Sequence, residues 1–349
     1  MKKKNSIVLQ KKVNLRNKYF KNTKIKKIYK VFRKNLFSQI ENNRFCIGVS
    51  GGPDSLALAF LCKIFSEEFN SKFLALIVNH NLRKGSENEA IKVKKILVKH
   101  KINAKILNWR GAIPKSNIQF YARNLRYSLL EKGCKKFKTN NLVLAHHEGD
   151  LIENFFIRMF RGSGLKGLSS FNVKSYSIGN SLNLIRPLLN LNKKQLTYVS
   201  KKVFKFYLTD PTNLKEKFLR TRVRNYLGKF ELEGLDLKKI KLTLKNLESS
   251  NESINFYKEK SINKYSRYLK NGKYIVSYDL FENESQEVIF RLISDILVKV
   301  SKKYYSPRGK DVVNLISKIQ SKGFKRLTLG GCIVEKVYDL LIFRKEFEF

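Results

Sequence analysis

The residues best suited to chemistry form one short run, Ser50-Gly51-Gly52-Pro53-Asp54-Ser55. Gly51 and Gly52 let the backbone take angles that other residues avoid and approach a ligand closely. Successive N–H groups of such a turn, together with the partial positive charge of a helix N-terminus, form a site for an anion such as phosphate. The two serines can donate hydrogen bonds, and Asp54 can cap the helix or face Mg²⁺. Because the Gly-Lys-Ser/Thr ending of a Walker A loop is missing, we expect a different phosphate-binding turn.

A second group of polar residues follows the apolar run 142–145 and consists of His146, His147 and Asp150. We expect Asp54 and Asp150 to be catalytic, as ligands of Mg²⁺ and as groups that orient a substrate. The alternative for each carboxylate is that it only caps a helix. We also expect His147 to be catalytic, the alternative being a histidine that satisfies a hydrogen bond in the core.

Five arginines are candidates for contacts with RNA or phosphate. Arg123 and Arg126 lie three residues apart, which places them on one face of a helix. Arg220, Arg222 and Arg224 occupy alternate positions, a spacing that would scatter them around a helix and align them along an extended segment. The spacing leaves both conformations open, and contact of these three side chains with a nucleotide or RNA is a hypothesis.

The elements that must position these groups alternate between strand and helix. Apolar runs at 45–49, 73–78, 105–109 and 142–145 are typical of buried strands. Amphipathic stretches at 58–69, 87–100 and 117–131, and one that follows the last apolar run and ends at 161, are typical of helices. This rhythm predicts an α/β fold, a doubly wound and mostly parallel sheet, whose ligands lie at the carboxyl ends of the strands. Residues 238–300 look mostly helical. A helix at 310–320 and strands at 326–328 and 332–343 predict a small α+β domain at the end.

The charge of the chain favours a polyanionic partner. Lys and Arg number 72 against 28 Asp and Glu, a net charge of +44, and residues 1–40 contain 14 basic and no acidic residues. Nucleic acid is the first candidate and an anionic membrane the second, although AT-rich coding also produces such a composition. Four unpaired cysteines suit a reducing compartment, and neither a secretory signal nor a membrane-length apolar run is visible. We therefore expect a cytoplasmic location and no membrane association.

The Ser50–Ser55 motif resembles the pyrophosphate-binding loop of the N-type ATP pyrophosphatases, which cleave ATP between its α and β phosphates. Further motifs are similar to those of the tRNA(Ile)-lysidine synthase family. Those motifs are Val78-Asn79-His80-Asn81-Leu82-Arg83; Trp109, Gly111 and Pro114; Ala122-Arg123-Asn124-Leu125-Arg126-Tyr127; Ala145-His146-His147-Glu148-Gly149-Asp150 with Glu153; Arg161-Gly162-Ser163-Gly164; Arg186-Pro187-Leu188-Leu189; Asp210-Pro211-Thr212-Asn213; and Arg220-Thr221-Arg222-Val223-Arg224. They cover residues 44–228 in the family's order.

The resemblance implies a reaction in which ATP adenylates the wobble cytidine of the isoleucine tRNA with a CAU anticodon, after which the amine of free L-lysine displaces AMP. It implies ATP and Mg²⁺ as cofactors, with Ser50, Gly51, Gly52, Pro53, Asp54 and Ser55 holding the pyrophosphate portion. The expected domains are a basic N-terminal extension (1–40), a PP-loop catalytic domain (41–228), a helical tRNA-binding region (229–300) and an α+β domain (301–349). A homodimer is one expectation for the assembly.

Two positions depart from the family pattern. The family often has two adjacent acidic residues where this chain has Gly149-Asp150, and a threonine where it has Asn154. The alternatives are another PP-loop enzyme, such as a tRNA thiolase or a guanylate synthetase, and a basic RNA-binding protein on an inactive ATPase scaffold. A thiolase calls for a catalytic cysteine or a cysteine pair, and a guanylate synthetase for an amidotransferase motif; the sequence displays neither.

Overall fold

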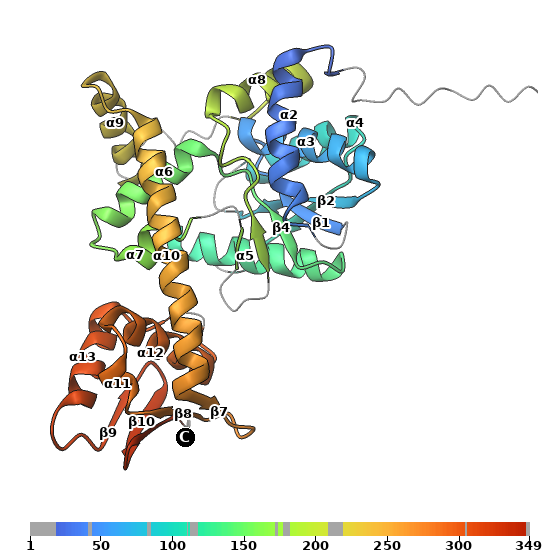
Figure 1. Cartoon of the computed structure of the whole chain (residues 1–349). Coiled ribbons are helices and arrows are strands. Elements are labelled where there is room, and N and C mark those ends of the chain that lie inside the picture. Colours follow the sequence, from blue (N-terminus) through green and yellow to red (C-terminus); the bar gives the residue numbers. More distant parts are fainter. Residues whose placement is uncertain are drawn as a thin grey trace, which may run out of the picture. The chain divides into compact units, whose positions relative to one another are not determined.

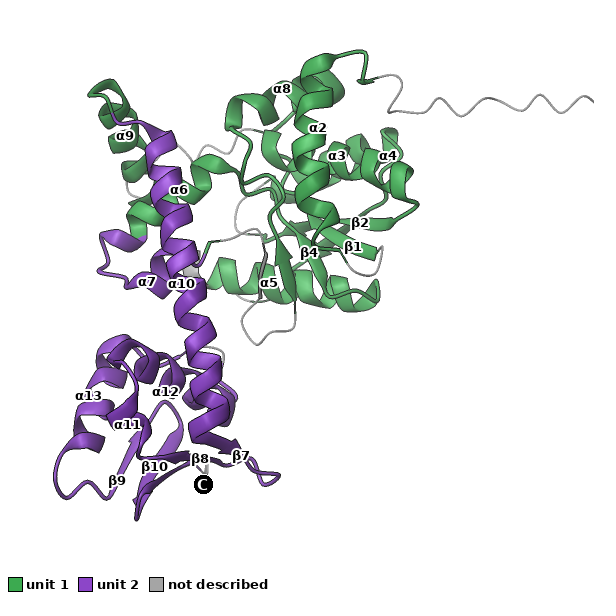
Figure 2. Ribbon diagram, viewed as in Figure 1, with its two compact units in different colours: residues 1–157, 171–176, 181–234 green, residues 158–170, 177–180, 235–349 purple. Residues whose placement is uncertain are grey.

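The chain folds as two compact units in a computed structural model, coloured green and purple in Figure 2. Unit 1 comprises residues 1–157, 171–176 and 181–234, and unit 2 comprises residues 158–170, 177–180 and 235–349. The structure describes residues 19–40, 44–81, 85–109, 111, 118–171, 174–176, 182–208, 219–303 and 306–346. Motif residues at 82–83, 114 and 210–213 lie outside these ranges.

Unit 1 is built on a six-stranded sheet with the strand order β3-β2-β1-β4-β6-β5. β5 pairs antiparallel with β6, and the other neighbours are parallel. This confirms the predicted α/β class and mostly parallel sheet. The strands are β1 (Arg44–Gly48), β2 (Lys72–Asn79), β3 (Ala104–Asn108), β4 (Asn141–Val143), β5 (Lys174–Tyr176) and β6 (Asn183–Ile185).

Helices cover both faces of this sheet, with α5 on one face and α2, α3 and α8 on the other (Figure 1). Along β1 the side chains alternate accordingly: Phe45 and Ile47 pack in one core cluster and Cys46 in the other. The helices of unit 1 are α2 (Thr23–Phe37), α3 (Pro53–Phe69), α4 (Ser86–Lys99), α5 (Ile118–Lys136), α6 (Glu148–Met159, whose last turn crosses into unit 2), α8 (Lys193–Phe204) and α9 (Leu219–Leu232).

The strand order places a topological switch point between β1 and β4. The chain runs outward from β1 through β2 to β3 and then returns to β4 on the other side of β1. Loops that leave β1 and β4 at their carboxyl ends therefore diverge to opposite sides, and the crevice between them is where such sheets bind ligands. The Ser50–Ser55 loop follows β1, and His147 and Asp150 follow β4.

The prediction that residues 1–40 form a basic extension is wrong for Thr23–Phe37. These residues form helix α2, which packs in the core of unit 1. One side of α2 is buried and largely apolar, and consists of Ile25, Ile28, Tyr29, Phe32 and Leu36. The lysines occupy the remaining positions, which are mostly exposed. The basic composition therefore belongs to the solvent face of an amphipathic helix.

Ile28→Val tests whether α2 stabilises unit 1. Because Ile28 is 1% exposed, removing one methyl group should lower the free energy of unfolding by about 1 kcal/mol. Chemical denaturation measures this change, and Lys27→Ala on the exposed side serves as the control. Equal stability of the Ile28→Val variant and the wild type would mean that the helix does not pack in solution.

Unit 2 has one core that joins the two domains predicted for 229–300 and 301–349. Its buried cluster runs from Ile262 through Leu292 and Ile316 to Phe343. The predicted boundary at 300/301 is therefore wrong, because the helices and sheet strands on either side of it share one hydrophobic core. The elements are α7 (Leu165–Leu168), α10 (Leu237–Tyr265), β7 (Ser266–Tyr268), β8 (Tyr274–Ser277), α11 (Leu280–Asn283), α12 (Gln286–Ser301), α13 (Gly309–Gln320), β9 (Arg326–Leu329), β10 (Cys332–Val337) and β11 (Leu340–Lys345).

The strands of unit 2 form an antiparallel sheet with the order β7-β8-β11-β10-β9. The helix at 310–320 and the strands near 326–328 and 332–343 were predicted, whereas β7 and β8 fall in a stretch expected to be helical. Among the helices of the described segments, none combines the length and apolar character needed to cross a bilayer.

Candidate active site

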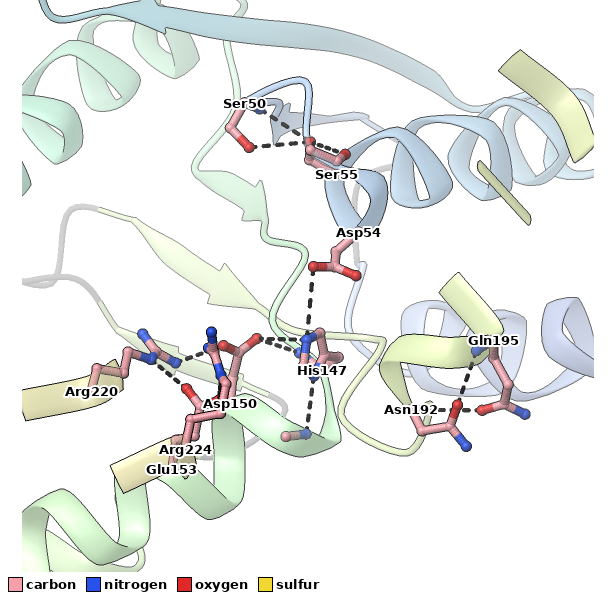
Figure 3. A network of polar contacts seen from close by, with 12 residues as sticks. Ser50, Asp54, Ser55, His147, Asp150, Glu153, Asn192, Gln195, Arg220 and Arg224 are labelled. Carbon is pink, nitrogen blue, oxygen red and sulfur yellow. Dashed lines mark hydrogen bonds and ion pairs between the residues drawn. The ribbon is translucent and has the colours of Figure 1, made fainter. Parts of the chain in front are cut away.

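The Ser50–Ser55 loop connects β1 to α3 and is closed by its two serines. Ser55 Oγ accepts a hydrogen bond from Ser50 N–H at 3.2 Å, lies 3.3 Å from Ser50 Oγ and donates to the Gly52 carbonyl at 3.0 Å. Figure 3 shows these contacts above the first turn of α3. Within the described residues no side chain caps α3, so its first N–H groups remain available to an anion.

Gly51 and Gly52 differ in why they are glycines. Gly51 has a φ of 85°, and a Cβ there would lie 2.5 Å from Val93 Cγ2 and 2.8 Å from Leu208 Cδ1, so both conformation and packing require glycine. Gly52 is the N-cap of α3 with a φ of −70°, an angle that any residue adopts. The prediction that both glycines take angles that other residues avoid is therefore wrong for Gly52, because only Gly51 has a positive φ.

Asp54 is the second residue of α3 and faces the end of β4. Its Oδ2 lies 3.7 Å from His147 Nε2, while its Oδ1 is buried and has no hydrogen-bond partner in the described part of the chain. Burial raises the pKa of Asp54, and the nearby Asp150 carboxylate adds to the increase, while His147 opposes it. A buried carboxylate oxygen without a partner is a suitable ligand for a cation or a substrate.

His147 and Asp150 lie at the start of α6, below Asp54 in Figure 3. Asp150 Oδ2 accepts the His147 backbone N–H at 2.9 Å, which is the return bond of a capping box, and lies 3.8 Å from His147 Nε2. Asp150 therefore caps its helix and also faces the site. Burial would raise the pKa of Asp150, but contacts with His147 and Arg220 outweigh it and lower the pKa.

Arg220 and Arg224 bind the carboxylates of α6 from helix α9. Arg220 donates from Nε to Glu153 Oε2 and from Nη2 to Asp150 Oδ1, both at 2.6 Å, and Arg224 Nε donates to Glu153 Oε1 at 2.7 Å. Glu153 is 4% exposed, so this pairing is largely desolvated on its side. The network fixes α9 against α6 within unit 1.

Of the two conformations that the spacing of Arg220, Arg222 and Arg224 leaves open, the structure shows the helix, because all three lie on α9. One turn of helix separates Arg220 from Arg224, so these two share a face, while Arg222 is exposed elsewhere on the helix. Arg123 and Arg126 lie on α5 as predicted: Arg123 packs 5.2 Å over the Tyr127 ring, and Arg126 donates to His80 Nε2 at 3.4 Å.

The buried Arg186 pairs with the partly buried His146, and Arg186 was not among the predicted site residues. Arg186 Nε donates to His146 Nδ1 at 3.3 Å, and its guanidinium lies 4.6 Å over the Phe171 ring. Burial, supported by Arg186, Arg220 and Arg123, lowers the pKa of His146 to about 3. Burial and Arg126 likewise lower the pKa of His80 to about 4. Both histidines are therefore neutral hydrogen-bonding groups at the carboxyl edge of the sheet.

Asp54 and Asp150 differ in how readily they could bind a magnesium ion. Among the described residues, no three His, Cys, Asp or Glu side chains are arranged to hold a metal. Mg²⁺ commonly takes only one or two carboxylates together with substrate phosphates, so the pair Asp54 and Asp150 remains compatible with it. Asp54 Oδ1 is free to bind. Both oxygens of Asp150 already accept hydrogen bonds, so metal binding there requires the loss of one contact.

Glu153→Ala tests the contacts of Glu153 with Arg220 and Arg224 separately from the role of Asp150. Two guanidinium groups lose their shared acceptor, which should lower the free energy of unfolding by about 1–2 kcal/mol. We keep this expected loss of stability small because the Arg220 and Arg224 side chains are 44% and 41% exposed, so that solvent screens their charges. We expect about tenfold lower turnover, since Arg220 then holds Asp150 alone. Denaturation and steady-state kinetics measure both effects; Glu231→Ala, exposed on α9, should change neither.

Comparison with known families agrees with this geometry. The model of the PP-loop domain matches residues 21–231, a range that includes α2, the sheet of unit 1 and most of α9. A structure with a similar fold is that of the U34-tRNA thiolase NcsA from Methanococcus maripaludis. Its TM-score is 0.53 at 18% identity, with 66% of this chain and 78% of that chain covered. The catalytic unit is thus of the ATP-utilising PP-loop class.

Two curated relatives are named tRNA(Ile)-lysidine synthase. The one from Orientia tsutsugamushi (strain Boryong) is 34% identical over 88% of this chain and 70% of its own length, and the one from Rickettsia akari (strain Hartford) is 32% identical over 92% and 74%. At this identity and coverage, the chain belongs to the tRNA(Ile)-lysidine synthase family of enzymes.

Proposed function

We propose that the protein joins free L-lysine to C2 of the wobble cytidine in isoleucine tRNA with a CAU anticodon. The C2 oxygen of the cytidine attacks the α-phosphate of ATP, and pyrophosphate leaves. The lysine amine then attacks C2, AMP leaves with the oxygen, and the amine loses a proton. The product is lysidine, and one ATP is consumed for each base modified.

The observation that most supports this function is the convergence of two motifs at the switch point. The phosphate-binding loop follows β1, and the segment that carries Asp150 and Glu153 follows β4. His147 Nε2 lies within 4 Å of a carboxylate oxygen of Asp54 and of one of Asp150. A loop for pyrophosphate beside carboxylates for a cationic amine is the arrangement that the two half-reactions require.

Each group in the crevice has a proposed task. Ser50, Gly51 and Ser55 hold the pyrophosphate portion of ATP. Asp54 is the main ligand for Mg²⁺, and Asp150 is the second. A bound Mg²⁺ ion would neutralise charge that develops on the phosphates. Asp150 also orients the lysine, whose amine must lose its proton before it attacks.

Basic groups outside the crevice are proposed to bind tRNA. Arg222 on α9 and Arg123 on α5 are exposed, and the excess of Lys and Arg over the whole chain attracts a polyanion. The helical region of unit 2, including α10, is proposed to contribute to tRNA binding through its lysines. A homodimer and a cytoplasmic location stay predictions, and analytical ultracentrifugation would check the first.

The cysteines argue against a thiolase, the rival within the PP-loop class. Cys46, Cys62, Cys134 and Cys332 are all buried. Burial raises the pKa of Cys62, and it raises that of Cys332 to about 11. A sulfur carrier needs an accessible thiol, and none of these four is accessible.

Exchange of labelled pyrophosphate into ATP tests the first half-reaction. We expect exchange that requires the CAU tRNA and proceeds without lysine, because adenylation of the cytidine comes first. An isoleucine tRNA of another anticodon is the matched control and should support no exchange. Exchange that is independent of tRNA, or that needs lysine, would contradict the proposed order of steps.

A further inference from the structure

The imidazole ring of His147 lies against the first turn of its own helix. Gly149 N–H donates a hydrogen bond to His147 Nδ1 at 3.0 Å. The backbone of His147 is held separately: its N–H donates to Asp150, its carbonyl accepts from Leu151 N–H at 3.2 Å, and it forms a parallel bridge with Leu188. When a neighbour changes, the ring is therefore the part that moves.

Position 149 has no room for a side chain while the ring lies there. A Cβ on Gly149 would lie 2.9 Å from His147 Cε1 and 3.2 Å from Nδ1. The backbone itself does not demand glycine, because Gly149 lies in α6 and is absent from the glycines with positive φ. It is the ring of His147 that requires glycine at this position.

We infer that Gly149 is a positioning residue, which seats the His147 ring so that Nδ1 accepts a hydrogen bond and Nε2–H faces both Asp54 and Asp150. A ring nitrogen that accepts from an N–H carries no proton, so this hydrogen bond places the ring proton on Nε2. Nε2 lies 3.7 Å from Asp54 Oδ2 and 3.8 Å from Asp150 Oδ2.

An N–H between two carboxylates has a direct consequence for the site. Like charges that close together disfavour each other's ionised form, and a donor directed between them offsets that repulsion. The His147 ring then holds the Asp54 and Asp150 carboxylates on either side of Nε2 until substrates arrive. This role rests on the proposed function, in which the two carboxylates serve ATP and lysine.

A double-mutant cycle tests the role of Gly149 in lysidine formation. Gly149→Ala should lower kcat at least about tenfold with the KM for ATP within about twofold, because the ring is displaced while the Ser50–Ser55 loop is untouched. Gly228→Ala on α9 is the matched control, since a Cβ there meets nothing within 4 Å. In a His147→Ala background, Gly149→Ala should change kcat by less than about twofold. An equal loss in both backgrounds would overturn the inference.

The tautomer can be observed independently of activity. The chain has four histidines, so nitrogen-15 NMR of labelled histidine side chains is readily assigned by substituting each in turn. We expect the His147 ring to be protonated at Nε2 alone in the wild type and in Gly228→Ala. In Gly149→Ala we expect a different distribution of the proton between Nδ1 and Nε2. Protonation of Nδ1 in the wild type, or no change in Gly149→Ala, would contradict the inference. A wild type that forms no lysidine yet has this spectrum would refute only the proposed function.

Discussion

Asp54→Asn should lower the rate of tRNA-dependent pyrophosphate exchange by about 10²–10³-fold, because the variant loses the negative charge that we propose binds Mg²⁺ beside the phosphates. The amide keeps nearly the same shape, so the fold should persist. Oδ1 of Asp54 is buried and has no hydrogen-bond partner among the described residues, so the fold does not depend on this carboxylate.

The same variant should gain stability at neutral pH. The pKa of Asp54 is raised in the folded state, so its favourable contribution is fully present below the unfolded pKa, about 3.9, and is lost as the pH rises through the folded value. At pH 7 the ionised carboxylate therefore destabilises the fold, and Asp54→Asn removes that cost. Thermal unfolding at pH 7 and pH 4 measures the difference, which should shrink at the lower pH.

Asp311→Asn is the matched control, because Asp311 is also an acidic residue in the first turn of a helix, α13 of unit 2. It should leave pyrophosphate exchange unchanged. If Asp54→Asn keeps more than about a tenth of the wild-type exchange rate, the role of Asp54 as a metal ligand is contradicted.

Binding of tRNA should weaken steeply with salt. With about six phosphates neutralised, the affinity should fall roughly 10³-fold between about 50 and 200 mM salt, since each neutralised phosphate releases bound counterions. The net charge of +44 is consistent with that number of contacts. Fluorescence anisotropy with labelled tRNA at several salt concentrations measures the slope.

Arg222→Ala should reduce the steepness of this salt dependence by about one phosphate contact. Arg224→Ala is the informative comparison, because Arg224 is paired with Glu153 and should leave the slope unchanged. An affinity that does not depend on salt would contradict an electrostatic mode of binding, and equal effects of the two substitutions would contradict the assignment of Arg222.

The parallel sheet and the phosphate loop could be predicted because both are encoded locally. Each central strand is a short apolar run, and the Ser50–Ser55 loop is closed by hydrogen bonds between its own residues. Helix α2 also carried a local signal, with Ile25, Ile28, Phe32 and Leu36 at helical spacing. The surrounding lysines concealed it, because composition averages over a whole segment whereas burial depends on one face.

The carboxylate network could not be predicted in the same way. Glu153 meets Arg220 and Arg224 across 67 and 71 residues of chain, and only the packing of α9 on α6 brings them together. The helix that carries Arg220, Arg222 and Arg224 could not be predicted either, because spacing alone does not decide between strand and helix in so short a stretch. The reason for Gly149 is likewise a contact with the ring of His147, which the sequence does not reveal.

The most direct test of the central claim is mass spectrometry of nucleosides after the protein is incubated with ATP, lysine and the CAU isoleucine tRNA. We predict a lysine adduct on one cytidine per tRNA, with AMP formed in equal amount and no adduct when lysine is omitted. AMP formation without a modified cytidine, or sulfur in place of lysine on the base, would contradict the proposed function.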